Sequence, residues 1–342
     1  MKLLSVSIAA YNVEQFLKQT LESFLVSNEL LEYLEVIIVS DGSSDHTVEI
    51  AREYEKKYPG CFVVVDKENG GYGSTINSSL KIASGKYFKT VDGDDWVDTK
   101  GLETLLDFLK ICEADLIISK FSTVSDVDGS VQEITNGLIY NNKVENYDYI
   151  LEYDKPPFLT MHALTFKTEL LRQCGLKITE KCFYTDAELV MKPLPYIRDV
   201  VKLDANVYMY RIGREGQSIS LKSRLKHMHE AVRVNLVKCV LIKNVFGNDS
   251  ISSIKKEYLG AAILHDIAFQ YYFFLVLNKR ESLEALREFD RAVYESGMFL
   301  YEGVLKTKYG TIIQRLRQND FERRGIIPFL YHLKMKCIDL RK

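Results

Sequence analysis

The sequence predicts an α/β fold, an open and mostly parallel sheet flanked by helices, followed by a helical C-terminal region. In the first hundred residues, four short runs rich in Val, Ile and Phe alternate with segments whose apolar residues recur at helical spacing. That alternation is typical of parallel sheets connected by helices. Beyond about residue 223 the pattern is helical. We therefore expect a sheet domain over residues 1–220 and a helical region over 221–342.

Composition excludes several classes of protein. The 342 residues are 46% hydrophobic and 27% charged with a net charge of −2, so the chain lacks the basic balance of nucleic-acid-binding proteins. Six scattered cysteines without a CxxC pair predict reduced thiols in a cytoplasmic protein. The N-terminal apolar run lacks the core of a signal peptide, and residues 267–277 are too short to span a membrane.

The elements of the first half follow in order. Strands are expected where apolar runs are bounded by turn residues, and helices where apolar positions recur every three or four residues. The strands are 3–10, 34–39, 61–65, 87–91 and 116–120, and the helices are 13–24, 47–58, 74–83 and 102–112. Residues 124–140 predict a hairpin, because Asp128-Gly129 is a strong turn signal between two β-rich runs.

The second half is less regular. We expect a helix over 141–153 that is broken by Pro156-Pro157, and a strand over 161–166. The remaining segments with a clear pattern are helices over 168–174 and 189–197, strands within 199–210, and helices over 225–246, 251–277 and 282–296.

Polar residues follow three of the predicted parallel strands. Tyr11-Asn12 follows the first strand, Asp41-Gly42-Ser43 the second and Asp92-Gly93-Asp94 the fourth. The carboxyl ends of parallel strands meet at one edge of a sheet, where ligands bind in open α/β folds. We therefore expect these loops to face one crevice.

The acidic turn at residues 92–95 is the most informative stretch. Its three carboxylates repel one another unless solvent or a cation separates them. Asp92 and Asp94 can point the same way at a strand end, and Gly93 lets the backbone approach a ligand closely. Mg²⁺ prefers one or two carboxylates plus phosphate oxygens. The turn therefore predicts a metal–diphosphate site, with a solvated helix-capping turn as the alternative.

Several segments in this order resemble family 2 glycosyltransferases of the GT-A fold. The resemblance covers roughly residues 3 to 215 and rests on 6–12, 36–47, 69–73, Asn77, Gly85 and 92–95. It implies an enzyme that moves a sugar from a nucleotide-sugar onto a growing glycan with inversion at the anomeric carbon. It also implies a GT-A domain over 1–220, with a nucleotide-sugar half over 1–120 and an acceptor half over 121–220.

The resemblance implies a donor pocket. Ala10, Tyr11 and Asn12 would line the base pocket, and Asp41 would accept a hydrogen bond from uracil N3–H. Ser40 departs from the acid or Asn that the family often carries before this Asp. Gly71, Asn77 and Gly93 would lie in the same region, although the glycines near Gly71 also fit an ordinary turn between strand and helix.

The resemblance also implies a metal and a catalytic base. Asp92 would lie toward the ribose and the metal, and Asp94 would bind Mn²⁺ or Mg²⁺ directly. His229 is a candidate third metal ligand, with a structural role as the alternative. Asp186 is the candidate base that deprotonates the acceptor, with Glu188 and Asp199 as weaker choices.

Two groups of basic residues are further candidates for binding. Arg211, with Arg214, could clamp the diphosphate, since guanidinium groups suit such oxygens, or both could be surface charges. The basic residues between Arg315 and Lys342 could rest on an anionic membrane surface, or the tail could pack on the body.

The expected donor is a UDP-sugar and the acceptor a glycan or lipid-linked glycan of a bacterial cell surface, on the cytoplasmic side of the plasma membrane. The alternatives are a sugar-phosphate nucleotidyltransferase and a non-catalytic relative that binds nucleotide or glycan. The former would carry a glycine-rich basic signature after the first strand, where Tyr11-Asn12-Val13-Glu14 stands.

Overall fold

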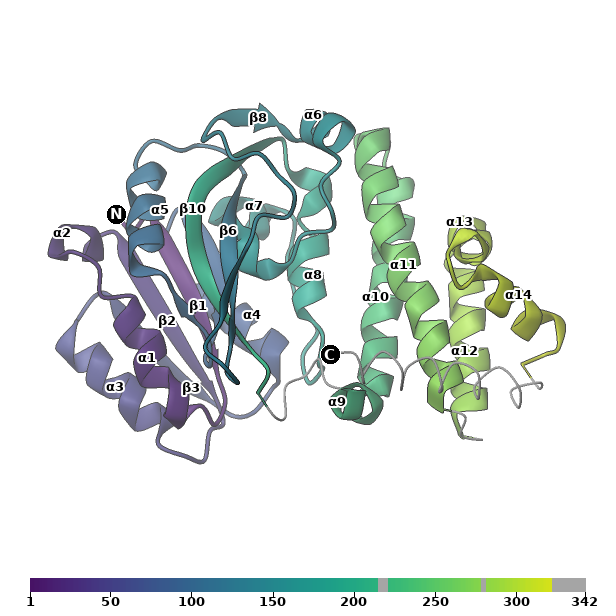
Figure 1. The fold of residues 1–342 in the computed structure, drawn as a ribbon, viewed down its shortest axis with the longest axis horizontal. Coiled ribbons are helices and arrows are strands. Elements are labelled where there is room, and N and C mark those ends of the chain that lie inside the picture. The colour runs from purple at the N-terminus through teal and green to yellow at the C-terminus, as the bar shows by residue number, and fades with distance from the viewer. Residues whose placement is uncertain (215–220, 278–280, 322–342) are drawn as a thin grey trace. The chain divides into compact units, whose positions relative to one another are not determined.

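A computed structural model describes residues 1–214, 221–277 and 281–321. The chain forms two compact units that divide at residue 218, close to the expected boundary near Ser220 (Figure 1).

The first unit begins with four parallel strands. They are β1 (Leu4–Ala10), β2 (Leu34–Asp41), β3 (Phe62–Lys67) and β4 (Tyr87–Asp92), in the spatial order β3-β2-β1-β4. The connecting helices are α1 (Glu14–Ser23), α3 (Thr47–Lys57) and α4 (Tyr72–Ile82). Right-handed crossovers put α1 and α3 on one face and α4 on the other, because the chain reverses direction across the sheet after β3 (Figure 1).

The remaining strands make the sheet mixed. β9 (Leu164–Lys167) is antiparallel to both β4 and β6 (Leu116–Ser125), and β10 (Asp199–Ile212) runs parallel to β6. The short strands β5 (Trp96–Val97), β7 (Val131–Ile134) and β8 (Val144–Asn146) are antiparallel additions. The expected α/β sheet flanked by helices is confirmed, with antiparallel pairing confined to its second half.

The shorter elements correct two expectations. Residues 141–153 are not one helix, because β8 pairs with β10 before α6 (Tyr147–Tyr149) and a π-helical turn, Ile150–Asp154, begin. The helix expected over 189–197 is instead α8 (Asp186–Met191) and a 3-10 turn, Leu194–Tyr196, since Pro193 and Pro195 end it. The others are α2 (Asn28–Leu31), α5 (Thr99–Leu109), the 3-10 turn Met161–Ala163 and α7 (Thr168–Gln173).

The register of the parallel strands brings the three polar loops to one edge. Ala9 lies opposite Asp92 across the β1–β4 pair, and Ala10 lies opposite Ser40 across the β1–β2 pair. Both faces of this part of the sheet are covered, so β1, β2 and β4 are almost wholly buried. The rigid strands therefore fix the starting points of the loops after β1, β2 and β4.

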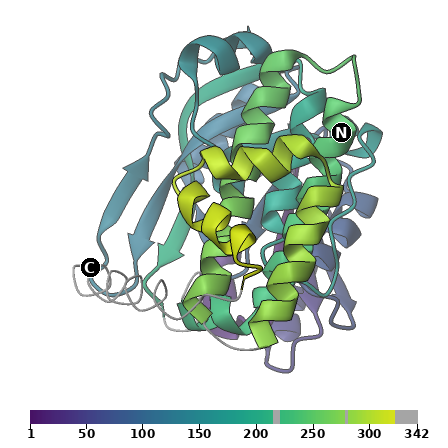
Figure 2. The same ribbon diagram turned by 90° about the vertical axis from the view of Figure 1, so that its right-hand side faces the viewer.

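The second unit is helical, as expected. Its elements are α9 (Leu221–Lys226), α10 (Met228–Phe246), α11 (Ser253–Leu277), α12 (Glu281–Glu295), α13 (Met298–Gly303), the 3-10 turn Val304–Lys306 and α14 (Gly310–Gln318). The yellow helices α13 and α14 face the viewer in Figure 2. A buried Asp290 accepts hydrogen bonds from Tyr271 at 2.6 Å and Arg317 at 2.7 Å. Among the described helices, none has the length and apolarity needed to cross a bilayer.

Candidate active site

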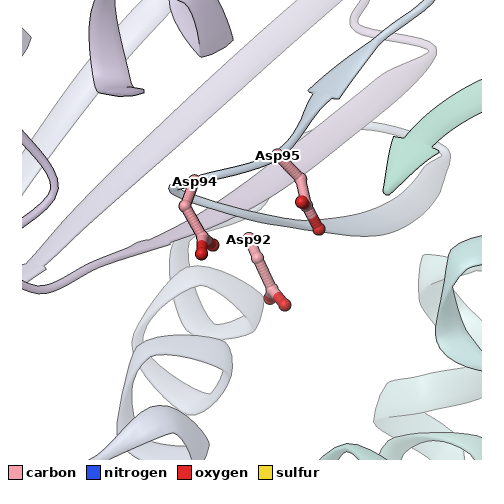
Figure 3. A group of neighbouring side chains, drawn as sticks. All are labelled: Asp92, Asp94 and Asp95. Atoms are coloured by element: carbon pink, nitrogen blue, oxygen red, sulfur yellow. The ribbon is translucent and has the colours of Figure 1, made fainter. Parts of the chain in front are cut away.

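The acidic turn after β4 gathers three carboxylates. Asp92, Asp94 and Asp95 each offer an oxygen within 4.8 Å of the others, and Figure 3 shows their side chains turned to the same side of the turn. Gly93 is required by the neighbouring strand, since a Cβ there would lie 2.7 Å from the carbonyl oxygen of Ala9. The close approach at Gly93 is thus to β1, whereas the sequence suggested an approach to a ligand.

Asp95 is held by the protein itself. Its carboxylate accepts hydrogen bonds from the Tyr208 hydroxyl at 2.6 Å and from the backbone N–H of Arg211 at 2.8 Å. Burial and the nearby Asp94 charge raise the pKa of Asp95 to about 7, while these two hydrogen bonds oppose that rise. Asp95 therefore ties the acidic turn to β10.

Asp92, unlike Asp95, has a carboxylate oxygen that the described part of the protein leaves without a hydrogen-bond partner. Its Oδ1 is buried and has no hydrogen-bond partner among the described residues. Burial, followed by the charges of Asp95 and Asp94, raises the pKa of Asp92 well above its usual range. A bound cation would compensate this oxygen, and Asp92 and Asp94 are the hard oxygen donors that Mg²⁺ and Mn²⁺ prefer. The residues present therefore fit a divalent metal.

Arg211 closes one side of the turn. Its guanidinium donates to the Asp94 carbonyl at 2.9 Å, to the Asp126 carboxylate at 2.7 Å and to the Gln19 side chain at 2.7 Å. Asp126 was expected only as part of a hairpin turn, and it is also an anchor for this arginine. Nothing in the local sequence indicates these contacts, because Asp126 lies 85 residues and Gln19 192 residues from Arg211 along the chain.

Aromatic rings hold the arginines in place. The Arg211 guanidinium carbon lies 4.9 Å from the ring centre of Phe16 and 4.8 Å from that of Trp96, and Arg214 lies 4.8 Å from Phe16. Arg214 also forms an ion pair with the Asp94 carboxylate. In this structure a guanidinium thus neutralises the carboxylate that we expected to bind the metal.

Asp41 is 3% exposed, and its carboxylate is engaged by the protein. Oδ1 accepts from Lys67 at 2.6 Å and from the N–H of Gly70 at 2.8 Å, and Oδ2 accepts from the N–H of Gly71 at 2.8 Å. The Ser74 hydroxyl adds a bond of 3.2 Å. Asp41 therefore organises the loop after β3. Its contact with the uracil of a bound nucleotide stays a prediction.

The residues after β1 lie at the same edge. Ala10 is buried, whereas Tyr11 is 54% exposed. Asn12 has a left-handed backbone with a φ of 52°, and its side chain accepts a hydrogen bond from the N–H of Ser44 at 2.8 Å. Asn12 therefore joins the loop after β1 to the loop after β2, and Tyr11 offers an exposed ring beside it.

Asp186 begins α8 close to the acidic turn. Its charge contributes to raising the pKa values of Tyr72, Asp92 and Tyr210, although burial is the main cause for each. The neighbouring alternative, Glu188, is buried and accepts hydrogen bonds from the Thr179 N–H and Lys192. Asp186 is exposed, so an acceptor can reach it more easily than it can reach the buried Glu188.

The remaining candidates are Asp199, His229 and the basic tail. Asp199 is wrong as an alternative base, because it begins β10 thirteen residues before Ile212, roughly 40 Å from the site end of a strand of that length. His229 lies on α10 in the second unit, and its role as a metal ligand stays a prediction. Most of the basic tail, beyond residue 321, lies outside the described residues.

Comparison with known proteins assigns the class. The family model described as glycosyl transferase family 2 matches residues 5–175, half of the chain, and the chain belongs to that family. Glycosyltransferase GlyA of Streptococcus pneumoniae is 26% identical over 71% of this chain and 35% of its own length. Minor teichoic acid biosynthesis protein GgaB of Bacillus subtilis is 31% identical over 63% of this chain and 23% of its own length. The matched part is thus about a quarter to a third of these relatives.

A solved structure shares the fold. Residues 1–349 of S. aureus TarS, in complex with UDP-GlcNAc, align with a TM-score of 0.71 and 21% identity. The alignment covers 98% of this chain and 92% of that chain, so it includes the helical region as well as the sheet.

Proposed function

We propose that this protein transfers a sugar from a UDP-sugar to a glycan or lipid-linked glycan acceptor of a bacterial cell surface, with inversion and with a divalent metal. The observation that carries the proposal is the unpartnered, buried Asp92 oxygen beside Asp94 at the carboxyl edge of a parallel sheet. Membership of the glycosyltransferase family supports the reaction class, and the TarS complex supports a UDP-sugar donor.

The transfer is one displacement at the anomeric carbon. The acceptor oxygen forms a bond to that carbon as the bond to the diphosphate breaks, and the acceptor proton goes to a base. Asp186 takes that role in our proposal, because it is an exposed carboxylate close to Asp92. A positioned base contributes about 10²–10⁴-fold in rate. The products are the glycoside, UDP and a proton.

The leaving diphosphate needs positive charge around it. A divalent cation bound there would act as a Lewis acid toward the diphosphate oxygens. Asp92 and Asp94 would hold it, while Arg211, fixed by Asp126 and Gln19, keeps a guanidinium beside the turn. Arg214 reaches the same place through Asp94, and its release would add a second guanidinium for the diphosphate.

The test is donor turnover by the full chain. A panel of nucleotide-sugars with Mn²⁺ is assayed for hydrolysis or transfer, followed by the anomeric configuration of the product. We expect a UDP-sugar to be used, and we expect Asp94→Ala to lower kcat/KM by at least about 10³-fold while the circular dichroism spectrum stays unchanged. Full activity of Asp94→Ala would refute the metal assignment, and pyrophosphate release from UTP and a sugar phosphate would indicate a nucleotidyltransferase instead.

A further inference from the structure

Two loops that are far apart in the sequence lie against each other beside the candidate site. One, which we call the first loop, is the turn after β3 together with the first turns of α4, residues 69–77. The other, the second loop, is the segment 178–186 that leads into α8. The N–H of Lys181 donates to the carbonyl of Gly70 at 2.5 Å. The first loop carries the bonds to Asp41, and the second ends at the candidate base Asp186.

Asn77 is the main polar link between the two loops. Its Nδ2 donates to the carbonyl of Ile178 at 2.9 Å, and its Oδ1 accepts from the N–H of the same residue at 2.9 Å. The side chain therefore pairs with both backbone groups of one residue, as a neighbouring strand would. Nδ2 also donates to Glu180 at 3.0 Å. The amide expected to contact the donor is thus engaged by the second loop.

The glycines of the first loop are explained by the same contact. A Cβ on Gly73 would collide with the carbonyl oxygen of Thr179, and one on Gly71 would lie 3.1 Å from the Lys181 backbone. Gly71 also has a φ of 79°, which other residues rarely adopt. These glycines therefore let the second loop approach.

The second loop is anchored in its first half, at residues 178, 179 and 181. Asn77 fixes Ile178, Glu188 accepts from the N–H of Thr179 at 3.2 Å, and Gly70 accepts from Lys181. Tyr184 then has a φ of 64°, a strained conformation for a non-glycine residue that persists only where the surrounding structure imposes it. This left-handed residue lies between the anchored residues 178–181 and Asp186, at the start of α8.

From these contacts we propose that Asn77 is a positioning residue for the reaction: it holds the segment 178–186 so that Asp186 meets the acceptor hydroxyl. The inference rests on the proposed function, since it takes Asp186 to be the base. A base must lie within hydrogen-bond reach of the proton that it takes, and a misplacement of about 1 Å can lower the rate by about 10²-fold. Asn77 acts through Asp186 and does not itself touch the reacting atoms.

The first experiment separates positioning from donor binding. In Asn77→Ala we expect kcat for transfer to fall about 10–100-fold, while the KM for the UDP-sugar stays within about twofold. A matched control is Asn146→Ala: Asn146 accepts a hydrogen bond from the N–H of Tyr149 at 3.2 Å and braces α6, next to the opposite end of β10. That variant should keep the full kcat. If Asn77→Ala fails to fold, Asn77→Asp, whose carboxylate can still accept from the N–H of Ile178 but has no N–H to donate, replaces it.

The second experiment asks whether Asn77 acts through Asp186. Rates are measured for Asp186→Asn, Asn77→Ala and the double variant. We expect the double variant to be as slow as Asp186→Asn alone, because a base that is absent cannot be misplaced. Multiplicative losses, or a raised donor KM in Asn77→Ala, would overturn the inference while leaving Asp186 as the base. An active Asp186→Asn would instead overturn the base assignment in the proposed function, and with it the inference.

Discussion

Asp41 and Asp92 end two strands that flank β1 in one sheet, yet the protein treats their carboxylates differently. Asp41 has a partner for each oxygen, from Lys67 and from the N–H groups of Gly70 and Gly71. Asp92 is left with a buried oxygen that no described residue satisfies. Leaving a charged group in that state costs free energy, so it persists where a ligand is expected to complete it. Asp41 belongs to the architecture of the site and Asp92 to its chemistry.

The largest expected effect tests the Asp92 side of this comparison. Asp92→Asn removes a charge from a crowded group of carboxylates, so we expect kcat/KM for transfer to fall about 10³-fold. The pKa of Asp92 is raised in the folded protein, so its ionisation opposes folding above the pKa of the unfolded chain. In urea unfolding at pH 7 without metal, the variant should therefore be more stable than the wild type. A less stable Asp92→Asn would contradict our account.

The second effect tests the Asp41 side. The native carboxylate only accepts, and it faces donors from Lys67, Gly70 and Gly71. Asp41→Asn replaces one of its oxygens with an NH2 donor, which cannot accept from any of them. We expect the free energy of unfolding to fall by about 3 kcal/mol, the cost typical of a broken buried pair. Asp66→Asn is the control, since Asp66 is exposed on the neighbouring strand and carries the same charge. An unchanged stability for Asp41→Asn would show that the carboxylate is not structural.

The contrast also explains what the sequence alone predicts. Local signals predicted the alternating strands and helices, the Asp-Gly hairpin, and the three polar loops at one edge. They could not distinguish Asp41 from Asp92, because each follows a strand and precedes a glycine. The difference arises from distant partners: Lys67 and Gly70 reach Asp41, while Tyr208 and Arg211 reach the carboxylate of Asp95 and leave Oδ1 of Asp92 without a partner in the described chain.

Other features that the sequence did not predict also depend on contacts between residues far apart in the chain. The helix expected over 141–153 was lost to strand pairing with β10, a tertiary contact that overrides local propensity. The resemblance placed Asn77 with the donor, and that role stays a prediction; its amide is engaged by Ile178, 101 residues away, which no local signal indicated.

The third prediction concerns the ion pair of Arg214 with Asp94. Because the guanidinium neutralises the carboxylate, it competes with a cation for Asp94. Arg214→Gln should therefore bind Mn²⁺ about tenfold more tightly in the absence of nucleotide, which electron paramagnetic resonance of free Mn²⁺ measures directly. Arg52→Gln makes the same change in net charge on α3, where Arg52 pairs with Glu55, and should leave Mn²⁺ binding unchanged. Equal affinities in the two variants would mean that Arg214 does not compete.

The smallest effect concerns His162, a third polar group packed behind the site. Its ring stacks on Tyr210 at 4.3 Å and meets the edge of Tyr208 at 4.8 Å between ring centres. Burial, and then the charge of Lys89, lowers the pKa of His162 to about 3. Below pH 6.5 the unfolded chain takes up a proton that the folded protein refuses, so this contribution to stability is lost as the pH falls from 6.5 toward 3.

The pH dependence of the free energy of unfolding tests this account of His162. Between pH 7 and pH 5 we expect a loss of about 1 kcal/mol, less than the full 1.36 kcal/mol per pH unit, because the residue as a whole is only half-buried and water screens part of the charge. His162→Phe should remove this loss, followed in urea unfolding by the fluorescence of Trp96, the single tryptophan. His46 is the opposing control: its bond to Glu14 raises its pKa, so His46→Gln should steepen the decline toward pH 5. If the stability of His162→Phe falls between pH 7 and pH 5 as steeply as that of the wild type, the imidazole is solvated in the folded protein and its packing against Tyr208 and Tyr210 does not exclude the proton.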